Sequence, residues 1–174
     1  AFAKANNLFV YTIATKETVQ VTTDGKKNAI INGITDWVYE EEFAFVRAFD
    51  WSADSKKIGF IKFDESQVPE FSMNIFQKEL YPKVETFKYP KPGEKNALVS
   101  LHIYDVALQS IKNVALSNYS DFYISRLKWT NDANILSAQV LNRHQDNLDL
   151  LFIDGNSAAA KVVLNEKDKA YIDV

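Results

Sequence analysis

The sequence predicts an all-β fold, and more narrowly a partial β-propeller of about two and a half four-stranded antiparallel blades. Two observations predict it: a repeated motif around tryptophan, and polar turns that separate short strands of alternating or β-branched residues. A third observation concerns two segments, one acidic and one proline-rich, that interrupt the repeat. They predict a short helical insertion and an extended proline-rich arm.

The repeat is clearest around two tryptophans. The stretches FDWSADSKKIGFIKFD (49–64) and LKWTNDANILSAQVLN (127–142) share an apolar residue, a Trp, a Ser or Thr, a polar turn with Asp, and an apolar strand. Trp51 and Trp129 are equivalent in this alignment. A second kind of half-unit, a strand with an aspartate near its end, occurs at residues 8–25, 101–117 and 150–166. The half-units keep the same order along the chain.

Each half-unit is typical of a hairpin with a tight polar turn, such as Ala53-Asp54-Ser55 or Asp154-Gly155-Asn156. Two half-units make four short antiparallel strands, and four-stranded units that repeat along the chain are typical of propeller blades. A closed propeller has roughly four to eight blades, so we expect a segment of a longer propeller. A small complete β-sandwich is the alternative, and the constant position of the Trp disfavours it.

The repeats divide the chain into parts of one propeller domain that spans residues 1–174. In chain order, we expect a half blade at 7–22, a helical glutamate insertion at 33–45, a blade at 46–117 that carries an arm at 65–96, and a further blade at 122–165.

The insertion GITDWVYEEEFAF contains three consecutive glutamates, Glu40, Glu41 and Glu42. A solvated surface helix normally mixes such charges with lysines, because like charges on neighbouring turns repel. Thr35 or Asp36 can cap a short helix that runs through WVYEEE (37–42), and we expect the acidic side chains to lie toward the N-terminal end that favours them. An exposed acidic helix without a function is the alternative.

The arm holds all four prolines of the chain, at positions 69, 82, 90 and 92. Proline cannot donate to a central strand ladder, so this segment is expected to form an edge ribbon or an extended arm. Its apolar residues are too many for a free loop: Phe71, Ile75, Phe76, Leu80, Tyr81 and Phe87. We expect them to require a partner surface.

Composition and motifs exclude several classes of function. A net charge of -3 argues against a general binder of nucleic acid or membrane surfaces, and no apolar run is long enough to span a bilayer. The five glycines are too dispersed for a nucleophile elbow or a phosphate-binding loop. His102 and His144 form no metal-binding motif and the chain has no cysteine, so we expect no metal and no cofactor.

Three stretches, in this order, resemble one protein family. They are NGITDWVYEEEF (32–43), the spaced pattern from WSAD to VPEFSM (51–73), and YPKVETFKYPKPGEKN (81–96). They are similar to the N-terminal propeller of the dipeptidyl peptidase IV enzymes in the prolyl oligopeptidase family. The lack of cysteines differs from mammalian members and is more similar to bacterial ones, which implies a periplasmic or secreted protein.

The resemblance implies the propeller part of a serine exopeptidase that releases N-terminal dipeptides with penultimate Pro or Ala. The family's Ser-Asp-His triad lies in a C-terminal α/β-hydrolase domain, and no residue of this chain can be assigned to it. The resemblance places binding of the substrate's free α-amine on Glu41 and Glu42, and it implies a homodimer contact through Phe71, Phe76 and Tyr81. A non-catalytic propeller that binds proteins is the alternative, since one architecture serves many functions.

Overall fold

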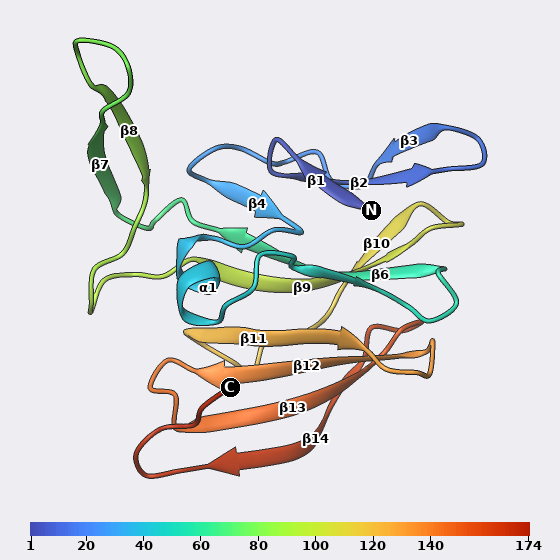
Figure 1. The fold of residues 1–174 in the computed structure, drawn as a ribbon. Coiled ribbons are helices and arrows are strands. Elements are labelled where there is room, and N and C mark those ends of the chain that lie inside the picture. Colours follow the sequence, from blue (N-terminus) through green and yellow to red (C-terminus); the bar gives the residue numbers. More distant parts are fainter.

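The computed structural model describes all 174 residues and confirms the all-β prediction, with fourteen strands in four antiparallel sheets and one short helix (Figure 1). The first sheet contains β1 (Phe2–Lys4), β2 (Asn7–Thr12) and β3 (Glu17–Gln20). The second contains β4 (Ile30–Asn32), β5 (Phe49–Trp51), β6 (Lys57–Asp64), β9 (Leu98–Asp105) and β10 (Ser110–Asn113). The third contains β11 (Phe122–Trp129), β12 (Ile135–Asn142), β13 (Asn147–Asp154) and β14 (Ala160–Lys167).

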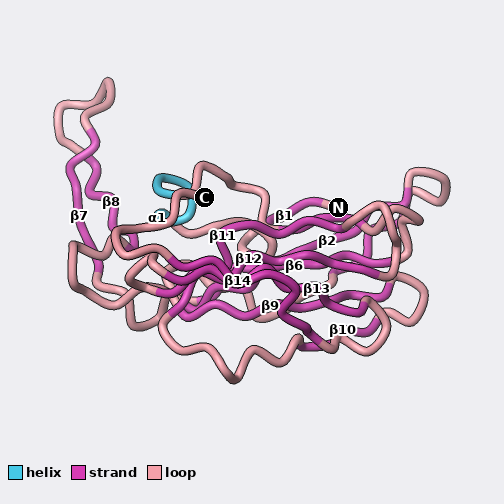
Figure 2. Tube along the Cα trace, turned by 90° about the horizontal axis from the view of Figure 1, so that it is seen from below, coloured by secondary structure: helices cyan, strands magenta, loops and turns pink.

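These three sheets lie one above the next in chain order, as propeller blades do (Figure 1). A cluster of 24 buried apolar residues includes side chains of both the second and the third sheet. A smaller cluster of six buried residues joins the first sheet to the second. Seen from below, the strands of the three sheets run along the same length of the molecule, and the fourth sheet stands away at one end (Figure 2). The hydrophobic core therefore consists of side chains packed between adjacent blades.

The two equivalent tryptophans end equivalent strands, because Trp51 is the last residue of β5 and Trp129 the last of β11. Trp129 is only 4% exposed, and two glycines give it room. A Cβ on Gly59 of the neighbouring blade would lie 3.3 Å from the indole Nε1, and a Cβ on Gly155 would lie 2.8 Å from Cη2. Any larger residue at Gly155 would displace the ring, so the repeat motif packs one blade against the next.

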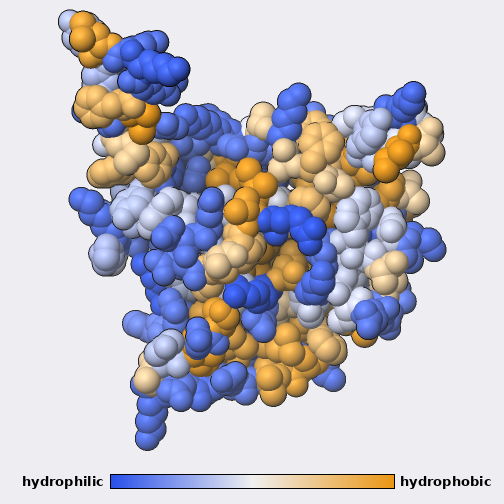
Figure 3. Space-filling view, in the orientation of Figure 1, coloured by the Kyte–Doolittle hydropathy of each residue, from blue (hydrophilic) through white to orange (hydrophobic).

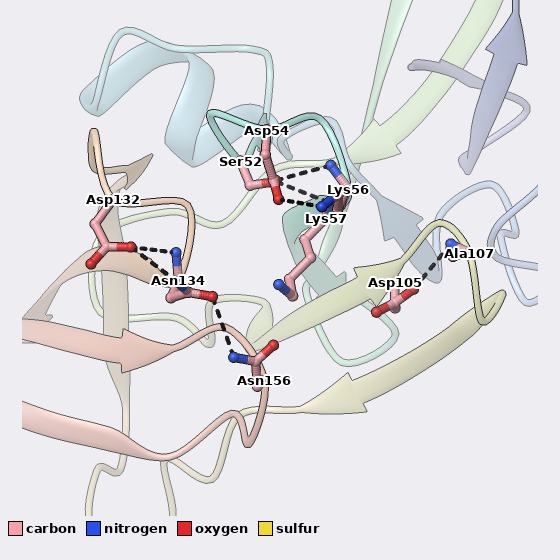
Figure 4. Close-up of polar contacts among 9 residues, drawn as sticks. All are labelled: Ser52, Asp54, Lys56, Lys57, Asp105, Ala107, Asp132, Asn134 and Asn156. Carbon is pink, nitrogen blue, oxygen red and sulfur yellow. Dashed lines mark hydrogen bonds and ion pairs between the residues drawn. The ribbon is translucent and has the colours of Figure 1, made fainter.

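The predicted polar turns form with side chains that bond to the backbone of their own turn and to one another (Figure 4). In the β5–β6 turn, Ser52 Oγ donates to Asp54 Oδ1 at 2.7 Å. In the β11–β12 turn, the N–H of Asn134 donates to Asp132 Oδ1 at 2.9 Å, and Asn156 of the β13–β14 turn donates to Asn134 Oδ1 at 3.3 Å. Such local bonds stabilise a turn against continued strand pairing, which is why Asp and Asn mark these positions.

The structure corrects two predicted boundaries. The half blade expected at 7–22 is wrong in extent, because β1 precedes it and pairs with β2, with Phe2 opposite Phe9. A strand of three residues is too short to show an alternating pattern, so nothing in the local sequence marks it. The four strands of the third sheet, where a further blade was expected at 122–165, run from Phe122 to Lys167.

The second correction concerns the start of the second blade, which was expected at residue 46, after the helical insertion. In the structure the insertion interrupts the edge strand of this blade, so the blade begins before the insertion. Both β4 and β5 pair with β6, with Ile31 opposite Phe63 and Asp50 opposite Gly59. Between them, the N–H of Gly33 donates to Ile61 O at 3.1 Å, and the N–H of Ile61 donates to Ala48 O at 2.9 Å. The insertion therefore leaves and re-enters the strand at one point of the ladder.

The proline-rich arm is a two-stranded ribbon of β7 (Glu70–Ile75) and β8 (Lys83–Lys88), which confirms the extended arm. Pro69 and Pro82 directly precede the two strands, and the other two prolines follow β8, so no proline removes a ladder donor. In Figure 1 the ribbon projects from the blades on the side of the helix α1 (Trp37–Glu42). With only six residues in that helix, the structure has no helix able to span a membrane.

Candidate functional site

The helix α1 begins at a side-chain cap. Asp36 accepts a hydrogen bond from the N–H of Tyr39 at 3.1 Å, so Asp36 is the cap and the other expected residue, Thr35, is not. Thr35 instead donates from its Oγ1 to Phe45 O at 3.0 Å, across the base of the insertion. Burial of the Asp36 carboxyl raises its pKa to about 6, and the bond from Tyr39 opposes this shift.

The helix is anchored by Tyr39, which is only 2% exposed. Its ring packs against four others at centroid distances from 4.8 to 6.1 Å, namely Phe43, Phe45, Phe63 and Tyr123. Its hydroxyl oxygen accepts a hydrogen bond from the N–H of Ile124 in β11 at 2.8 Å. A helix of six residues is only marginally stable in isolation, so this packing holds it in place.

The three glutamates are exposed, and they differ in their position on the helix. Glu40 lies in the first turn, whereas Glu41 and Glu42 are the last two helical residues. The expectation that all of them lie toward the N-terminal end is therefore wrong for Glu41 and Glu42. Their charges stand at the helix end where the backbone dipole disfavours anions. None of the three carboxylates has a hydrogen bond or an ion pair with another residue of the chain.

A cation from β11 contacts the same helix end. Arg126 donates from Nη1 to Phe43 O at 3.0 Å and from Nη2 to Val174 O at 2.9 Å. Its guanidinium also lies over the Phe45 ring, 6.0 Å from the centroid. Arg126 was not identified from the sequence as a functional residue, because a lone arginine within the strand FYISRLKW carries no recognisable signal.

Glu42 borders a hollow of about 330 Å³ between the helix, the base of the arm and the third sheet. Trp37, Tyr89 and Tyr123 contribute aromatic walls, and Lys91 and Arg143 contribute positive charges. Glu41 is not among the residues that line it. Arg143 also lines an adjoining open hollow of about 720 Å³. The glutamate helix thus stands at the margin of a concave surface.

The arm is joined to the glutamate helix by aromatic contact. The rings of Trp37 and Tyr89 lie 4.2 Å apart between centroids. Phe71 packs within the arm, 5.6 Å from Tyr89, and is 38% exposed. Phe76 and Tyr81 at the tip are each 79% exposed. The arm stands clear of the blades with apolar groups on its surface (Figure 3). The three expected contact residues therefore form two groups: Phe71 packs within the ribbon, whereas Phe76 and Tyr81 are exposed at its tip.

A cluster of charges lies where the arm leaves the blade. Burial raises the pKa of Glu65 to about 7, and the nearby Asp36 carboxylate raises it further, whereas Lys88 lowers it. Lys88 donates to Val68 O at 2.8 Å and lies 3.5 Å from the Glu70 carboxylate. The cap of α1 and the root of the arm therefore share one electrostatic environment.

The histidines have separate surroundings. His102 stacks on Phe60 at 5.2 Å and bonds with Ser100 Oγ at 2.8 Å, and burial lowers its pKa to about 4. It is therefore neutral at physiological pH and packs as a structural residue. His144 is exposed in the β12–β13 turn and lines the larger hollow. The structure contains no group of three His, Asp or Glu residues arranged to hold a metal ion.

Comparison with known proteins gives consistent matches along the whole chain. The model of the family described as the dipeptidyl peptidase IV (DPP IV) N-terminal region matches residues 1–174. A probable dipeptidyl-aminopeptidase B of Coccidioides posadasii is 34% identical over 176 residues, which cover 93% of this chain and 19% of that protein. Dipeptidyl-aminopeptidase B of Aspergillus niger is 33% identical over 181 residues, which cover 95% of this chain and 20% of that protein.

A solved structure agrees with the fold in detail. The crystal structure of Porphyromonas gingivalis dipeptidyl peptidase 4 superimposes with a TM-score of 0.95 at 43% identity, and the match covers 99% of this chain and 24% of that chain. The chain thus spans about a fifth of the length of the curated relatives that it matches.

Proposed function

Because this chain belongs to the family of dipeptidyl peptidase IV N-terminal regions, we propose that it is the substrate-docking propeller segment of a serine exopeptidase. The parent enzyme releases dipeptides from the N-termini of peptides whose penultimate residue is proline or alanine. Its catalytic serine belongs to an α/β-hydrolase domain of the parent chain. The segment itself recognises the substrate's N-terminus.

Recognition depends on the free α-ammonium group, which offers three N–H donors and a positive charge. Glu41 and Glu42 supply two carboxylates for it. The observation that carries this role is their position: both are exposed, without a partner in the chain, at the helix end whose dipole disfavours them. A bound cation would relieve that unfavourable charge, and charge-assisted hydrogen bonds to it are among the strong ones.

The hollow beside Glu42 supports a peptide-binding role for the same surface. Its aromatic walls and its opening toward solvent suit a flexible apolar chain held at one end by polar groups. Glu40 sits a residue earlier, in the first turn of the helix, and has no part in the proposed contact.

Substitution of each glutamate by glutamine in the full-length parent enzyme tests the proposal. Glu41→Gln and Glu42→Gln keep the size of the side chain and remove its charge, so each should lower kcat/KM for free-amine substrates by about 30- to 1000-fold. Glu40→Gln is the matched control and should change kcat/KM far less. If Glu41→Gln and Glu42→Gln both retain near wild-type efficiency, the amine-binding role is wrong.

We also propose that the arm forms part of a homodimer contact. The tip residues Phe76 and Tyr81 are each 79% exposed, and Leu80 between them is 90% exposed. Three large apolar side chains at one ribbon tip have no burial partner within the chain, and such groups on a projecting element are typical of an association surface.

A further inference from the structure

We propose that Arg126 is a positioning residue for the glutamate pair, aimed at the C-terminal end of α1 by a β-bulge in β11. The inference rests on the proposed function, because Arg126 has this role only if Glu41 and Glu42 bind the substrate amine. Nothing in the sequence motif around the glutamates includes Arg126, which lies more than eighty residues later in the chain.

The bulge is visible in the pairing of β11 with β12. Ile124 pairs with Val140 and Arg126 pairs with Gln139, so Ser125 is an extra residue on β11. Ser125 is fully buried, and its hydroxyl has no hydrogen-bond partner. A bulge leaves its extra residue unpaired, bends the strand and redirects side chains, and bulges are frequent beside active sites.

This bulge is where the glutamate helix docks. The N–H of Ile124 donates to the Tyr39 hydroxyl oxygen at 2.8 Å. Two residues later, Arg126 Nη1 donates to Phe43 O at 3.0 Å. The first bond holds the buried face of the helix, and the second holds the backbone directly after Glu42. Together they restrict both rotation and tilt of the short helix against β11.

The donors of Arg126 are used on backbone carbonyls. Besides Phe43 O, Arg126 Nη1 donates to Ser125 O at 2.7 Å, and Nη2 donates to Val174 O at 2.9 Å. The last carbonyls of a helix lack partners within the helix, so a side-chain donor there completes its end. Arg126 forms no ion pair with a glutamate, and both carboxylates stay free to accept bonds from an ammonium group.

The sign of the expected effect separates positioning from simple electrostatics. A positive charge near the site repels the substrate ammonium, so if Arg126 acted only through its charge, its removal would strengthen substrate binding. If Arg126 positions the helix, its removal lets the carboxylates move, and displacement of a binding group by about 1 Å can cost about 100-fold in rate. The two accounts therefore predict changes in opposite directions.

The test uses the full-length parent enzyme and a dipeptidyl substrate with a free amine. Arg126→Met should lower kcat/KM by about 10- to 100-fold, largely through KM. Arg126→Lys can still donate one bond and should recover part of the loss. Lys128→Met is the matched control: it removes the same charge from the same strand, and Lys128 is 70% exposed and contacts Asp50, not α1.

A combined variant distinguishes positioning from general damage to the fold. In a Glu41→Gln, Glu42→Gln background, Arg126→Met should cost less than about threefold more, because the groups it positions have already lost their charge. Full additivity, or a rise of kcat/KM in the single variant, would overturn the inference. Where Arg126→Met fails to fold, Arg126→Lys gives the same comparison, with a smaller loss in the wild-type background.

The glutamate variants also separate this inference from the proposed function. If Glu41→Gln and Glu42→Gln lose activity while Arg126→Met keeps the wild-type kcat/KM, the positioning role of Arg126 is wrong and the proposed function stands. Wild-type efficiency in both glutamate variants removes the proposed function and the inference together.

Discussion

Gly33 stands where the edge strand of the second blade breaks to admit the glutamate helix. Its φ angle is +75°, a region that costs a non-glycine residue energy, and a Cβ at this position would meet Leu8 Cδ1 at 3.0 Å. Its N–H and its carbonyl both bond at the point where the insertion closes, to Ile61 and Ala48. The glycine therefore combines a special backbone conformation with close packing against the first blade.

Gly33→Ala should destabilise the propeller by about 1 to 3 kcal/mol, because it adds backbone strain to a steric conflict in a packed region. Chemical denaturation of the parent protein measures the loss. Gly93→Ala is the matched control, since Gly93 has a φ of +85° and a Cβ added there would have no atom within 4 Å. An equal loss in both variants would show that packing against Leu8 contributes nothing.

At the same scale, the proposed role of Glu41 and Glu42 was suggested by the resemblance of the motif to a known family, whereas their physical setting came from the structure. A capped helix was predictable from the sequence, which offered Asp36 as one of two caps. Its extent was predictable too, because the helix expected through WVYEEE is the helix observed at Trp37–Glu42. Arg126 was beyond prediction because its contact with Phe43 spans 83 positions and depends on a bulge.

Among the elements, the arm meets the blade at a point where a buried carboxyl makes stability depend on pH. The folded-state pKa of Glu65 is about 7, above its ordinary value of 4.5. Its proton is therefore bound more tightly in the folded state, and the stability from this difference is present below about pH 4.5 and is lost as the pH rises through about 7. The ionised carboxylate is unfavourable there because of burial and the neighbouring Asp36.

Glu65→Gln should therefore raise the melting temperature of the parent protein at pH 8 by a few degrees, since it removes a buried negative charge. The difference from wild type should shrink toward zero near pH 4.5. Thermal unfolding at both pH values measures it, with Glu85→Gln on the exposed face of the arm as a control of equal charge change. A gain that is the same at both pH values would contradict the assigned pKa.

The arm itself yields a prediction about assembly. Replacement of Phe76 and Tyr81 by Ser should shift the mass of the parent protein from dimer to monomer in light scattering, because it removes two exposed apolar anchors. Phe71 serves as an internal comparison, since it packs on Phe87 and Tyr89 and supports the ribbon. A dimer mass that survives the tip substitutions would place the interface elsewhere.

Element prediction succeeded where side-chain chemistry is local and failed where it is not. The prolines marked the arm because each would have removed a donor from a ladder. The Asp-containing turns marked the hairpins because Asp54 and Asp132 accept hydrogen bonds from the backbone of their own turns. In contrast, β1 and β4 have three residues each and are strands only because a longer neighbour pairs with them. Tertiary pairing of that kind leaves no local pattern.

At the scale of the whole molecule, the blades at both ends keep apolar side chains on their outer faces. Phe2 stacks on Phe9 in the first sheet and is 39% exposed. In the last sheet, Phe152 is 38% exposed and Leu164 is 54% exposed. Apolar faces of this kind normally pack against another sheet, so we expect further blades of the parent propeller to cover them.

The central claim is that two carboxylates of one short helix bind the free amine of the substrate. The most direct test is the free-energy coupling between these carboxylates and a ligand amine. Inhibition constants of an aminoacyl pyrrolidide and of the analogue without the amine are measured for wild-type parent enzyme and for the Glu41→Gln, Glu42→Gln variant. We expect the wild type to prefer the amine ligand strongly and the variant to lose most of that preference, a coupling of about 2 to 4 kcal/mol. An equal preference in both enzymes would contradict the claim.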